Sequence, residues 1–167
     1  MNQLEQFRDI RAFIFDVDGV LTNNQVLVME NGQLLRNMSV RDGYAIRCAV
    51  EAGYKVCVIT GARSEGVRLR LEALGVTDIY IGIQDKLEPY ESFISAYGLD
   101  EAHVLYMGDD LPDYPVMRRA GLPCCPGDAA PEIMGLALYI SPLKGGEGCA
   151  RDVIEKVLRL NGRWLTE

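Results

Sequence analysis

The stretch FIFDVDGVLT at residues 13–22 begins as an apolar run, then places two aspartates one residue apart, and continues with a glycine and a second apolar run. Two carboxylates a few ångströms apart repel each other, and both are costly beside a hydrophobic core unless a cation or a proton neutralises them. In an extended chain Asp16 and Asp18 point to the same side. The stretch therefore predicts a buried strand that ends at a cation site.

Apolar runs of strand length recur along the chain and alternate with segments of helical periodicity. Most of the runs lack polar alternation, as expected for strands that are covered on both faces. The helical segments 42–53, 64–75 and 86–98 each end in a glycine suited to a left-handed C-cap. This alternation predicts an α/β fold, a three-layer, Rossmann-like parallel sheet with helices on both faces. The expected strands are 12–15, 55–60, 78–82, 103–108, 121–125 and 137–141.

One segment interrupts the pattern. QVLVMENGQLLRN (25–37) contains two apolar runs joined by Asn31-Gly32, a strong hairpin signal. We expect a β-hairpin at about 24–37, inserted after the first strand. A lone two-stranded hairpin is marginal in water, so we expect it to pack on another copy of the chain. Its apolar residues are Val26, Leu27, Val28, Met29, Leu34 and Leu35.

Length and composition limit the class of protein. The chain has 167 residues, of which 49% are hydrophobic, so we expect one domain over 1–167 with a sizeable core. No long apolar run or signal peptide is evident, which predicts a cytoplasmic protein without membrane contact. The net charge of -7 argues against nucleic acid as a partner. The five cysteines have no C-x-x-C spacing and are expected to be reduced.

Ligands of parallel sheets collect at the carboxyl ends of the strands. The residues at those ends form a set suited to phosphoryl transfer, with magnesium held by Asp16, Asp18 and Asp109. We expect one carboxylate, Asp16, to attack phosphorus and the other, Asp18, to transfer protons. The phosphoryl oxygens would contact three further residues, Thr60, Gly61 and Lys86.

Each motif alone has an ordinary explanation. Asp-x-Asp-Gly often forms turns, Thr-Gly often follows a strand, and a single lysine is usually a solvated charge. Their joint occurrence, in order and at strand ends, favours a catalytic site. A further pair, Asp42 and Gly43, could hydrogen-bond a substrate, although an Asp-Gly at that place is equally explained as a helix N-cap.

In these motifs the chain resembles the haloacid dehalogenase superfamily. DVDG (16–19), Thr60-Gly61, Lys86 and GDDLPD (108–113) are similar to its four motifs in order. The resemblance implies Asp16 as nucleophile and Asp18 as acid/base, with the Asp18 carbonyl as a further magnesium ligand. It also implies phosphate binding by Thr60 and Lys86, magnesium binding by Asp109, and support of the metal's waters and the lysine by Asp110 and Asp113.

The intervals from Asp16 to Thr60 and from Thr60 to Lys86 are too short for the superfamily's cap domains. The chain resembles an uncapped branch whose substrate is 3-deoxy-D-manno-octulosonate 8-phosphate. Hydrolysis of this compound belongs to the formation of lipopolysaccharide precursors. KGGEGCARDVIEKVL (144–158) is similar to that branch's Gly-Gly-x-Gly-x-x-Arg pattern. The resemblance implies a magnesium-dependent phosphomonoesterase that assembles as a homotetramer through its hairpins, with active sites between subunits.

Three alternatives have different sequence signals. A sister group acting on 2-keto-3-deoxynononate 9-phosphate typically has a glutamate and a lysine where this chain has Ala62 and Ala73. A noncatalytic oligomerisation domain of sugar-nucleotide synthetases is disfavoured because the acidic motifs are intact. A response-regulator receiver is disfavoured by motif order, since its phosphorylated aspartate lies on a middle strand.

Basic residues near the second motif are candidates for binding an anionic sugar acid. Arg63, Arg68 and Arg70 follow Thr60-Gly61. Positions 68 and 70 do not share a helix face, whereas positions four or five apart lie closer. We therefore expect Arg63 and Arg68 to contact the substrate.

Overall fold

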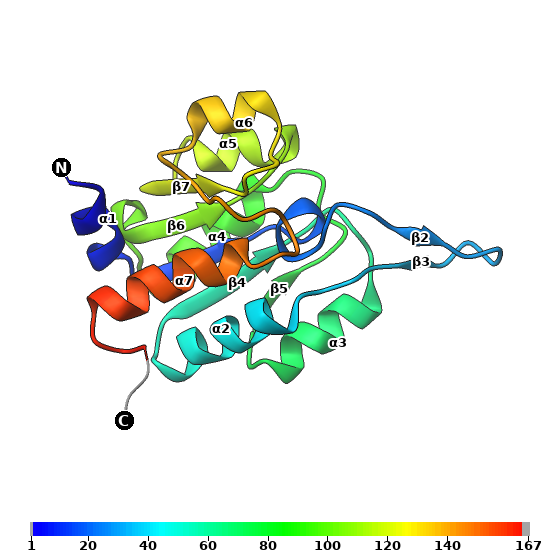
Figure 1. Cartoon of the computed structure of the whole chain (residues 1–167), viewed down its shortest axis with the longest axis horizontal. Coiled ribbons are helices and arrows are strands. Elements are labelled where there is room, and N and C mark those ends of the chain that lie inside the picture. Colours follow the sequence, from blue (N-terminus) through cyan, green and yellow to red (C-terminus); the bar gives the residue numbers. More distant parts are fainter. Residues whose placement is uncertain (1, 165–167) are drawn as a thin grey trace.

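The computed structural model describes residues 2–164. Six parallel strands form one sheet in the order β5-β4-β1-β6-β7-β8, so the strand that carries the DVDG motif lies at its centre (Figure 1). This confirms the predicted parallel α/β architecture. The strands are β1 (Ala12–Phe15), β4 (Lys55–Ile59), β5 (Asp78–Tyr80), β6 (Val104–Met107), β7 (Leu122–Cys125) and β8 (Tyr139–Ile140).

Helices cover both faces of the sheet, as predicted. Alternate residues of β1 enter different cores, Phe13 and Phe15 on one face and Ala12 and Ile14 on the other. The first face is covered by α1 (Gln3–Asp9), α2 (Val40–Glu51), α3 (Glu65–Ala73) and α7 (Cys149–Leu160). The second is covered by α4 (Leu87–Tyr97), α5 (Tyr114–Met117) and α6 (Pro131–Leu136). Shorter turns are η1 (Val17–Leu21), η2 (Glu101–His103) and η3 (Leu111–Asp113).

The element boundaries follow the sequence signals closely, with one correction at α2. Gly53, Gly75 and Gly98 follow α2, α3 and α4 with positive φ, as their C-cap assignment requires. The start of α2 differs from the expectation. Its N-cap is Ser39, whose hydroxyl accepts a hydrogen bond from the Asp42 amide, so Asp42 is not the cap.

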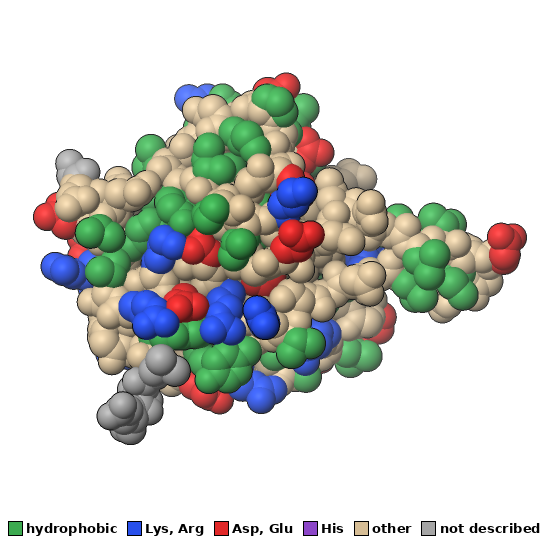
Figure 2. All heavy atoms as spheres, in the orientation of Figure 1, with side chains coloured by type: hydrophobic (Ala, Val, Ile, Leu, Met, Phe, Trp, Pro, Cys, Tyr) green, Lys and Arg blue, Asp and Glu red, His purple; other side chains and the backbone are tan. Residues whose placement is uncertain are grey.

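The predicted hairpin is present and protrudes from the body of the molecule (Figure 1). It consists of β2 (Leu27–Val28) and β3 (Leu34–Leu35), which pair antiparallel around a turn with Gly32 at φ +86°. All six of its apolar residues named above are exposed, and Val28 retains 65% of its accessible surface. Figure 2 shows apolar side chains gathered on this protrusion. Contiguous exposed apolar surface of this kind commonly marks an interaction site.

Within residues 2–164, no helix combines the length and the hydropathy that crossing a lipid bilayer demands. All five cysteines are free thiols, and four of them are buried. Burial raises the pKa of Cys57 and of Cys124 well above the ordinary value for a thiol. The four buried cysteines therefore pack as small apolar side chains.

Candidate active site

The predicted catalytic residues meet at the carboxyl edge of the sheet because their strands are neighbours. Asp16 follows β1, Thr60 follows β4, and Asp109 lies two residues beyond β6. The Asp16 amide donates to the Met107 carbonyl across 3.1 Å, which ties the end of β1 to the end of β6. The parallel order β4-β1-β6 thus brings three separate motifs to one place.

The glycine of DVDG is explained by both its backbone and its neighbour. Gly19 has φ +88°, a conformation that residues with a Cβ rarely adopt. A Cβ on Gly19 would lie 1.8 Å from Asp109 Oδ2, so the site has no room for one. Glycine therefore allows the first motif to turn sharply and the Asp109 carboxylate to approach the loop.

A buried network joins Lys86 to two carboxylates. The Lys86 ammonium donates to Asp113 Oδ1 at 2.7 Å and lies 2.9 Å from Asp16 Oδ1. The Tyr106 hydroxyl also donates to Asp113 Oδ1 at 2.7 Å, and the Asp109 amide donates to Asp113 Oδ2 at 3.0 Å. Asp113 thus receives donors on both oxygens and holds the lysine and the Asp109 loop in place.

Tyr106 is a site residue that the sequence analysis missed. It belongs to β6 and is fully buried, so its hydroxyl lies in a strand whose other residues are apolar. A buried tyrosine hydroxyl needs a partner, and this was the available signal. Burial and the Asp113 charge raise the pKa of Tyr106 well above its ordinary value, so the hydroxyl remains a donor to that carboxylate.

The donor set fits a hard divalent cation. Carboxylate oxygens of Asp16, Asp109 and Asp113 all lie within 4.8 Å of one another, and all three residues are buried. Burial, with Asp113 next, raises the pKa of Asp16 well above its ordinary value, although Lys86 opposes the rise. Burial, again with Asp113 next, raises the pKa of Asp109 to about 7. One ammonium does not neutralise three clustered carboxylates, and a divalent cation bound by oxygen ligands would.

Thr60 follows the end of β4 and is buried, with 1% of the residue's surface exposed. Its hydroxyl accepts a hydrogen bond from the Ala62 amide at 3.1 Å, and its own amide donates to the Tyr80 carbonyl. The Thr60 carbonyl accepts from Ile83, so the turn that contains Gly61 is fixed on both sides. This geometry presents a hydroxyl and a close backbone approach at the edge of the acidic cluster.

Asp18 lies apart from the other carboxylates and is paired with Arg36. The Arg36 guanidinium donates from Nε to Asp18 Oδ1 at 2.6 Å and from NH2 to Oδ2 at 3.2 Å. The arginine side chain is 7% exposed and comes from the base of the hairpin. Sequence reasoning missed Arg36, because no local pattern indicates that a hairpin residue reaches the first motif.

A cavity of about 960 Å³ lies between the hairpin and the start of α3. Arg36, Arg63 and Arg70 all line it, and so does Ala62. Arg63 lines this cavity, whereas Arg68, expected beside it, does not. Arg63 precedes α3, so helical spacing does not apply to it, and Arg68 instead forms ion pairs with two glutamates of its own helix.

Asp42 and Gly43 lie at the first turn of α2 and are both buried. Asp42 Oδ1 accepts from the Arg151 amide at 2.8 Å, in the first turn of α7, and its Oδ2 has no hydrogen-bond partner. Burial raises the pKa of Asp42. A Cβ on Gly43 would lie 2.7 Å from Arg70 NH2, so this glycine leaves space for the arginine that lines the cavity.

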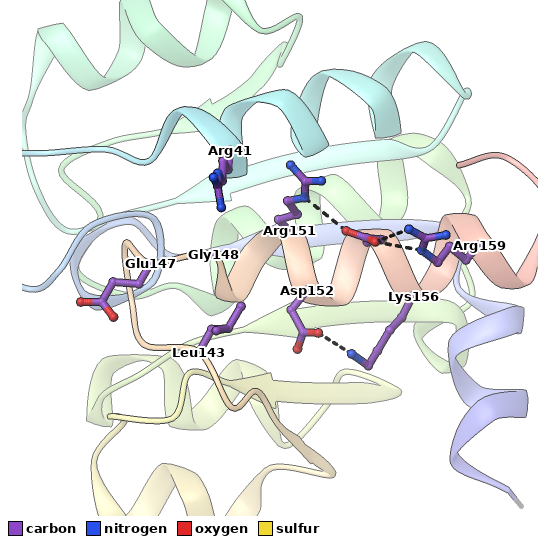
Figure 3. Close-up of a pocket in the computed structure, with 9 residues that line it drawn as sticks. Arg41, Leu143, Glu147, Gly148, Arg151, Asp152, Lys156 and Arg159 are labelled. Carbon is purple, nitrogen blue, oxygen red and sulfur yellow. Dashed lines mark hydrogen bonds and ion pairs between the residues drawn. The ribbon is translucent and has the colours of Figure 1, made fainter. Parts of the chain in front are cut away.

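The Gly-Gly-x-Gly-x-x-Arg segment contributes to a second cavity, of about 660 Å³, beside α7 (Figure 3). Gly148 and Arg151 line it, but its charges are largely satisfied within the protein. Arg151 forms an ion pair with Glu155, which also pairs with Arg159 one turn further along the helix (dashed lines in Figure 3). The first glycine of the segment, Gly145, packs instead against the loop of the DVDG motif. A Cβ there would lie 2.0 Å from the Gly19 carbonyl oxygen.

Comparison with known proteins gives a consistent result. No protein-family model matches the chain. The 3-deoxy-D-manno-octulosonate 8-phosphate phosphatase KdsC of Escherichia coli strain K12 is 37% identical over 155 residues, which make up 93% of this chain and 82% of that protein. A solved structure from Legionella pneumophila, assigned to the HAD superfamily, subfamily III A, has a TM-score of 0.93 at 32% identity and covers 96% of this chain and 88% of that one.

A second structure links this fold to ligands. The 3-deoxy-D-manno-octulosonate 8-phosphate phosphatase of Moraxella catarrhalis, in complex with a magnesium ion, a phosphate ion and KDO, has a TM-score of 0.90 at 30% identity. The match covers 94% of this chain and 90% of that one. Sequence motifs, sheet order and the acidic cluster agree with both kinds of comparison. The chain belongs to the KdsC family of phosphatases, in the haloacid dehalogenase superfamily.

Proposed function

We propose that this protein is a magnesium-dependent phosphatase that hydrolyses 3-deoxy-D-manno-octulosonate 8-phosphate to the free sugar acid and phosphate, in the formation of lipopolysaccharide precursors. The observation that carries the proposal is the buried cluster of Asp16, Asp109, Asp113 and Lys86 at the carboxyl edge of the sheet. The match to KdsC over 93% of the chain supports the substrate.

In the first half of the reaction, Asp16 Oδ attacks phosphorus as the bond from phosphorus to the sugar oxygen breaks. Asp18 donates the proton that this leaving oxygen requires. In the second half, Asp18 takes a proton from water, the water oxygen bonds to phosphorus, and Asp16 leaves as a free carboxylate. Thr60, the Gly61 amide and Lys86 bind the phosphoryl oxygens in both halves.

Asp16, Asp109 and the carbonyl of Asp18 would hold Mg²⁺. When bound, Mg²⁺ offsets the charge of the nucleophile and of the phosphoryl oxygens, so that the two anions can approach each other. Asp113 orients Lys86 and the Asp109 amide from behind, since donors already occupy both of its oxygens. Asp110 caps the turn that follows, by accepting from the Leu111 amide at 2.8 Å.

The cavity lined by Arg36, Arg63 and Arg70 is the proposed site of the sugar acid. Its guanidinium groups suit a substrate carboxylate, which the global charge of -7 otherwise repels. Ala62 lines the same cavity and offers no charged partner for the extra hydroxyl of a nine-carbon substrate. The proposed substrate is therefore the eight-carbon acid, and 2-keto-3-deoxynononate 9-phosphate is the alternative.

Association into a homotetramer through the hairpins, with active sites between subunits, is part of the proposal. The exposed apolar ribbon of the hairpin supports it, and so does the position of Arg36 at the hairpin's base, next to the cavity. A neighbouring subunit over this cavity would exclude water from the substrate, as a cap domain does in other enzymes. We further propose a cytoplasmic location.

A phosphate-release assay with the two sugar acid phosphates side by side, in Mg²⁺ and in chelator, tests the function. We expect Mg²⁺-dependent release and a higher kcat/KM for the eight-carbon substrate. The control is Asp16→Asn, which removes the nucleophile while keeping the side-chain volume, and is expected to lack activity at unchanged circular dichroism. Equal or better use of the nine-carbon substrate would refute the substrate assignment, and turnover by the Asp16→Asn variant would refute the mechanism.

A further inference from the structure

Arg36 connects two sites that the proposed function treats separately. Its guanidinium donates hydrogen bonds to both oxygens of Asp18, at 2.6 and 3.2 Å. The same side chain lines the cavity proposed for the sugar acid. A guanidinium that binds one carboxylate through two parallel bonds binds another equally well. A carboxylate that enters the cavity would therefore compete directly with Asp18 for Arg36.

The geometry also limits what Asp18 can do in this state. The two bonds from Arg36 fix the orientation of the Asp18 carboxylate, so Asp18 must break them before it can turn to the leaving oxygen of a phosphate ester. The arginine side chain is 7% exposed and the aspartate 37%, so the arginine is held more firmly in place than its partner. Asp18 is the member of the pair with room to turn.

We propose that Arg36 is a positioning residue that keeps Asp18 inactive until the carboxylate of the substrate takes over its guanidinium. The inference rests on the proposed function, because it needs a substrate that carries both a phosphate and a carboxylate. Arg63 and Arg70 line the same cavity and would attract that carboxylate to Arg36. Asp18 then takes up a proton from solvent water, turns to the leaving oxygen and donates that proton as the phosphorus–oxygen bond breaks.

The arrangement would couple substrate choice to the rate of chemistry. A sugar acid phosphate releases Asp18 on binding, whereas a simple sugar phosphate without a carboxylate leaves the pair intact. Discrimination between them should then be visible in kcat as well as in KM, because the missing group lowers the fraction of complexes with a free Asp18. A purely structural arginine gives no such difference.

The test compares Arg36→Ala and Arg36→Lys with wild type on three substrates. These are 3-deoxy-D-manno-octulosonate 8-phosphate, ribose 5-phosphate, which lacks a carboxylate, and p-nitrophenyl phosphate, whose leaving group needs no proton. For Arg36→Ala we expect kcat/KM of the sugar acid to fall about tenfold or more, and kcat of ribose 5-phosphate to rise. We expect kcat of p-nitrophenyl phosphate to rise less than that of ribose 5-phosphate, because its leaving group needs no proton and only the water step uses Asp18. The ammonium of Arg36→Lys cannot form two parallel bonds to one carboxylate. Its kinetic constants should therefore lie between those of wild type and of Arg36→Ala.

A parallel fall of kcat on all three substrates would overturn the inference, and so would unchanged kinetics. Should Arg36→Ala not fold, Arg36→Lys carries the same comparison, with its thermal unfolding measured beside it. The outcome is separate from that of the proposed function. If wild type prefers a nine-carbon acid, the opposite responses of carboxylate-bearing and carboxylate-free substrates still decide the role of Arg36.

Discussion

Lys86 Nζ lies 2.9 Å from Asp16 Oδ1, so the lysine proposed to bind phosphate also contacts the proposed nucleophile. Both side chains are at most 10% exposed. Burial lowers the pKa of Lys86, but Asp16 and Asp113 outweigh that effect, and the net pKa is raised. The ammonium therefore stays charged, and it is the only cation paired with the acidic cluster among the described residues.

Replacement of this lysine should be costly. Lys86→Met leaves Asp16 and Asp113 buried without their cation, and we expect the free energy of unfolding in chelator to fall by about 3 kcal/mol or more. Urea unfolding measures this, and phosphate release should be abolished. The matched control is Lys55→Met, at an exposed lysine whose ammonium lies 4.7 Å from the centre of the Tyr97 ring, with an expected loss of about 1 kcal/mol or less. Equal losses at both positions would contradict the network.

The pH dependence of stability should reveal the acidic cluster. The folded-state pKa of Asp109 is raised to about 7, compared with about 3.9 in an unfolded chain. The folded state thus holds the proton more tightly. The contribution of the protonated Asp109 to the free energy of unfolding is complete below about pH 4 and is lost as the pH rises through about 7.

We therefore expect Asp109→Asn to stabilise the metal-free protein relative to wild type, and to do so more at about pH 8 than at about pH 5. Thermal unfolding in chelator measures this difference. Added Mg²⁺ should raise the unfolding temperature of wild type and have little effect on the variant, which has lost a ligand. A wild type that does not respond to Mg²⁺ would argue against the metal site.

Gly19 and Gly32 form a natural matched pair. Both have positive φ, +88° and +86°, so alanine at either position costs about 1–2 kcal/mol in backbone strain. At Gly32 a Cβ meets nothing within 4 Å, whereas at Gly19 it would strike the Asp109 carboxylate. We expect Gly32→Ala to lose stability only, and Gly19→Ala to lose activity and the response of its unfolding temperature to Mg²⁺ as well. A Gly19→Ala enzyme with normal turnover would show that Asp109 need not lie there.

The hairpin should control assembly. Val28→Glu places a charge on its most exposed apolar position, and light scattering should then report a species smaller than the tetramer proposed for wild type. Leu4→Glu on α1, at a residue that is 56% exposed, is the control and should leave the mass unchanged. Activity should fall in the Val28 variant alone, because its active site loses the neighbouring subunit. An active monomer would separate assembly from catalysis.

The sheet and the acidic motifs were predictable because they follow from local patterns. Apolar runs of strand length, helical periodicity and glycine C-caps each depend on neighbours in sequence. Parallel topology then brings the ends of β1, β4 and β6 together without further information. Asp16, Thr60 and Asp109 could therefore be assigned to one edge of the sheet before any coordinates were known.

The contacts between elements could not be predicted in the same way. Arg36 reaches Asp18 only because the hairpin returns to the first motif, and Arg70, not Arg68, lines the cavity with Arg63. Asp42 caps the distant α7 through the Arg151 amide instead of its own helix. In each case the partner is decided by side-chain direction and packing between elements far apart in sequence, which single-sequence periodicity does not contain.

The contact of Gly145 with the Gly19 carbonyl has a consequence for biosynthesis. The loop that holds the first aspartates is completed by a segment that the ribosome makes long after that loop. A nascent chain therefore carries its nucleophile long before the surroundings of that nucleophile exist. Fragments from translation that stops before this segment should therefore not hydrolyse cellular phosphate esters.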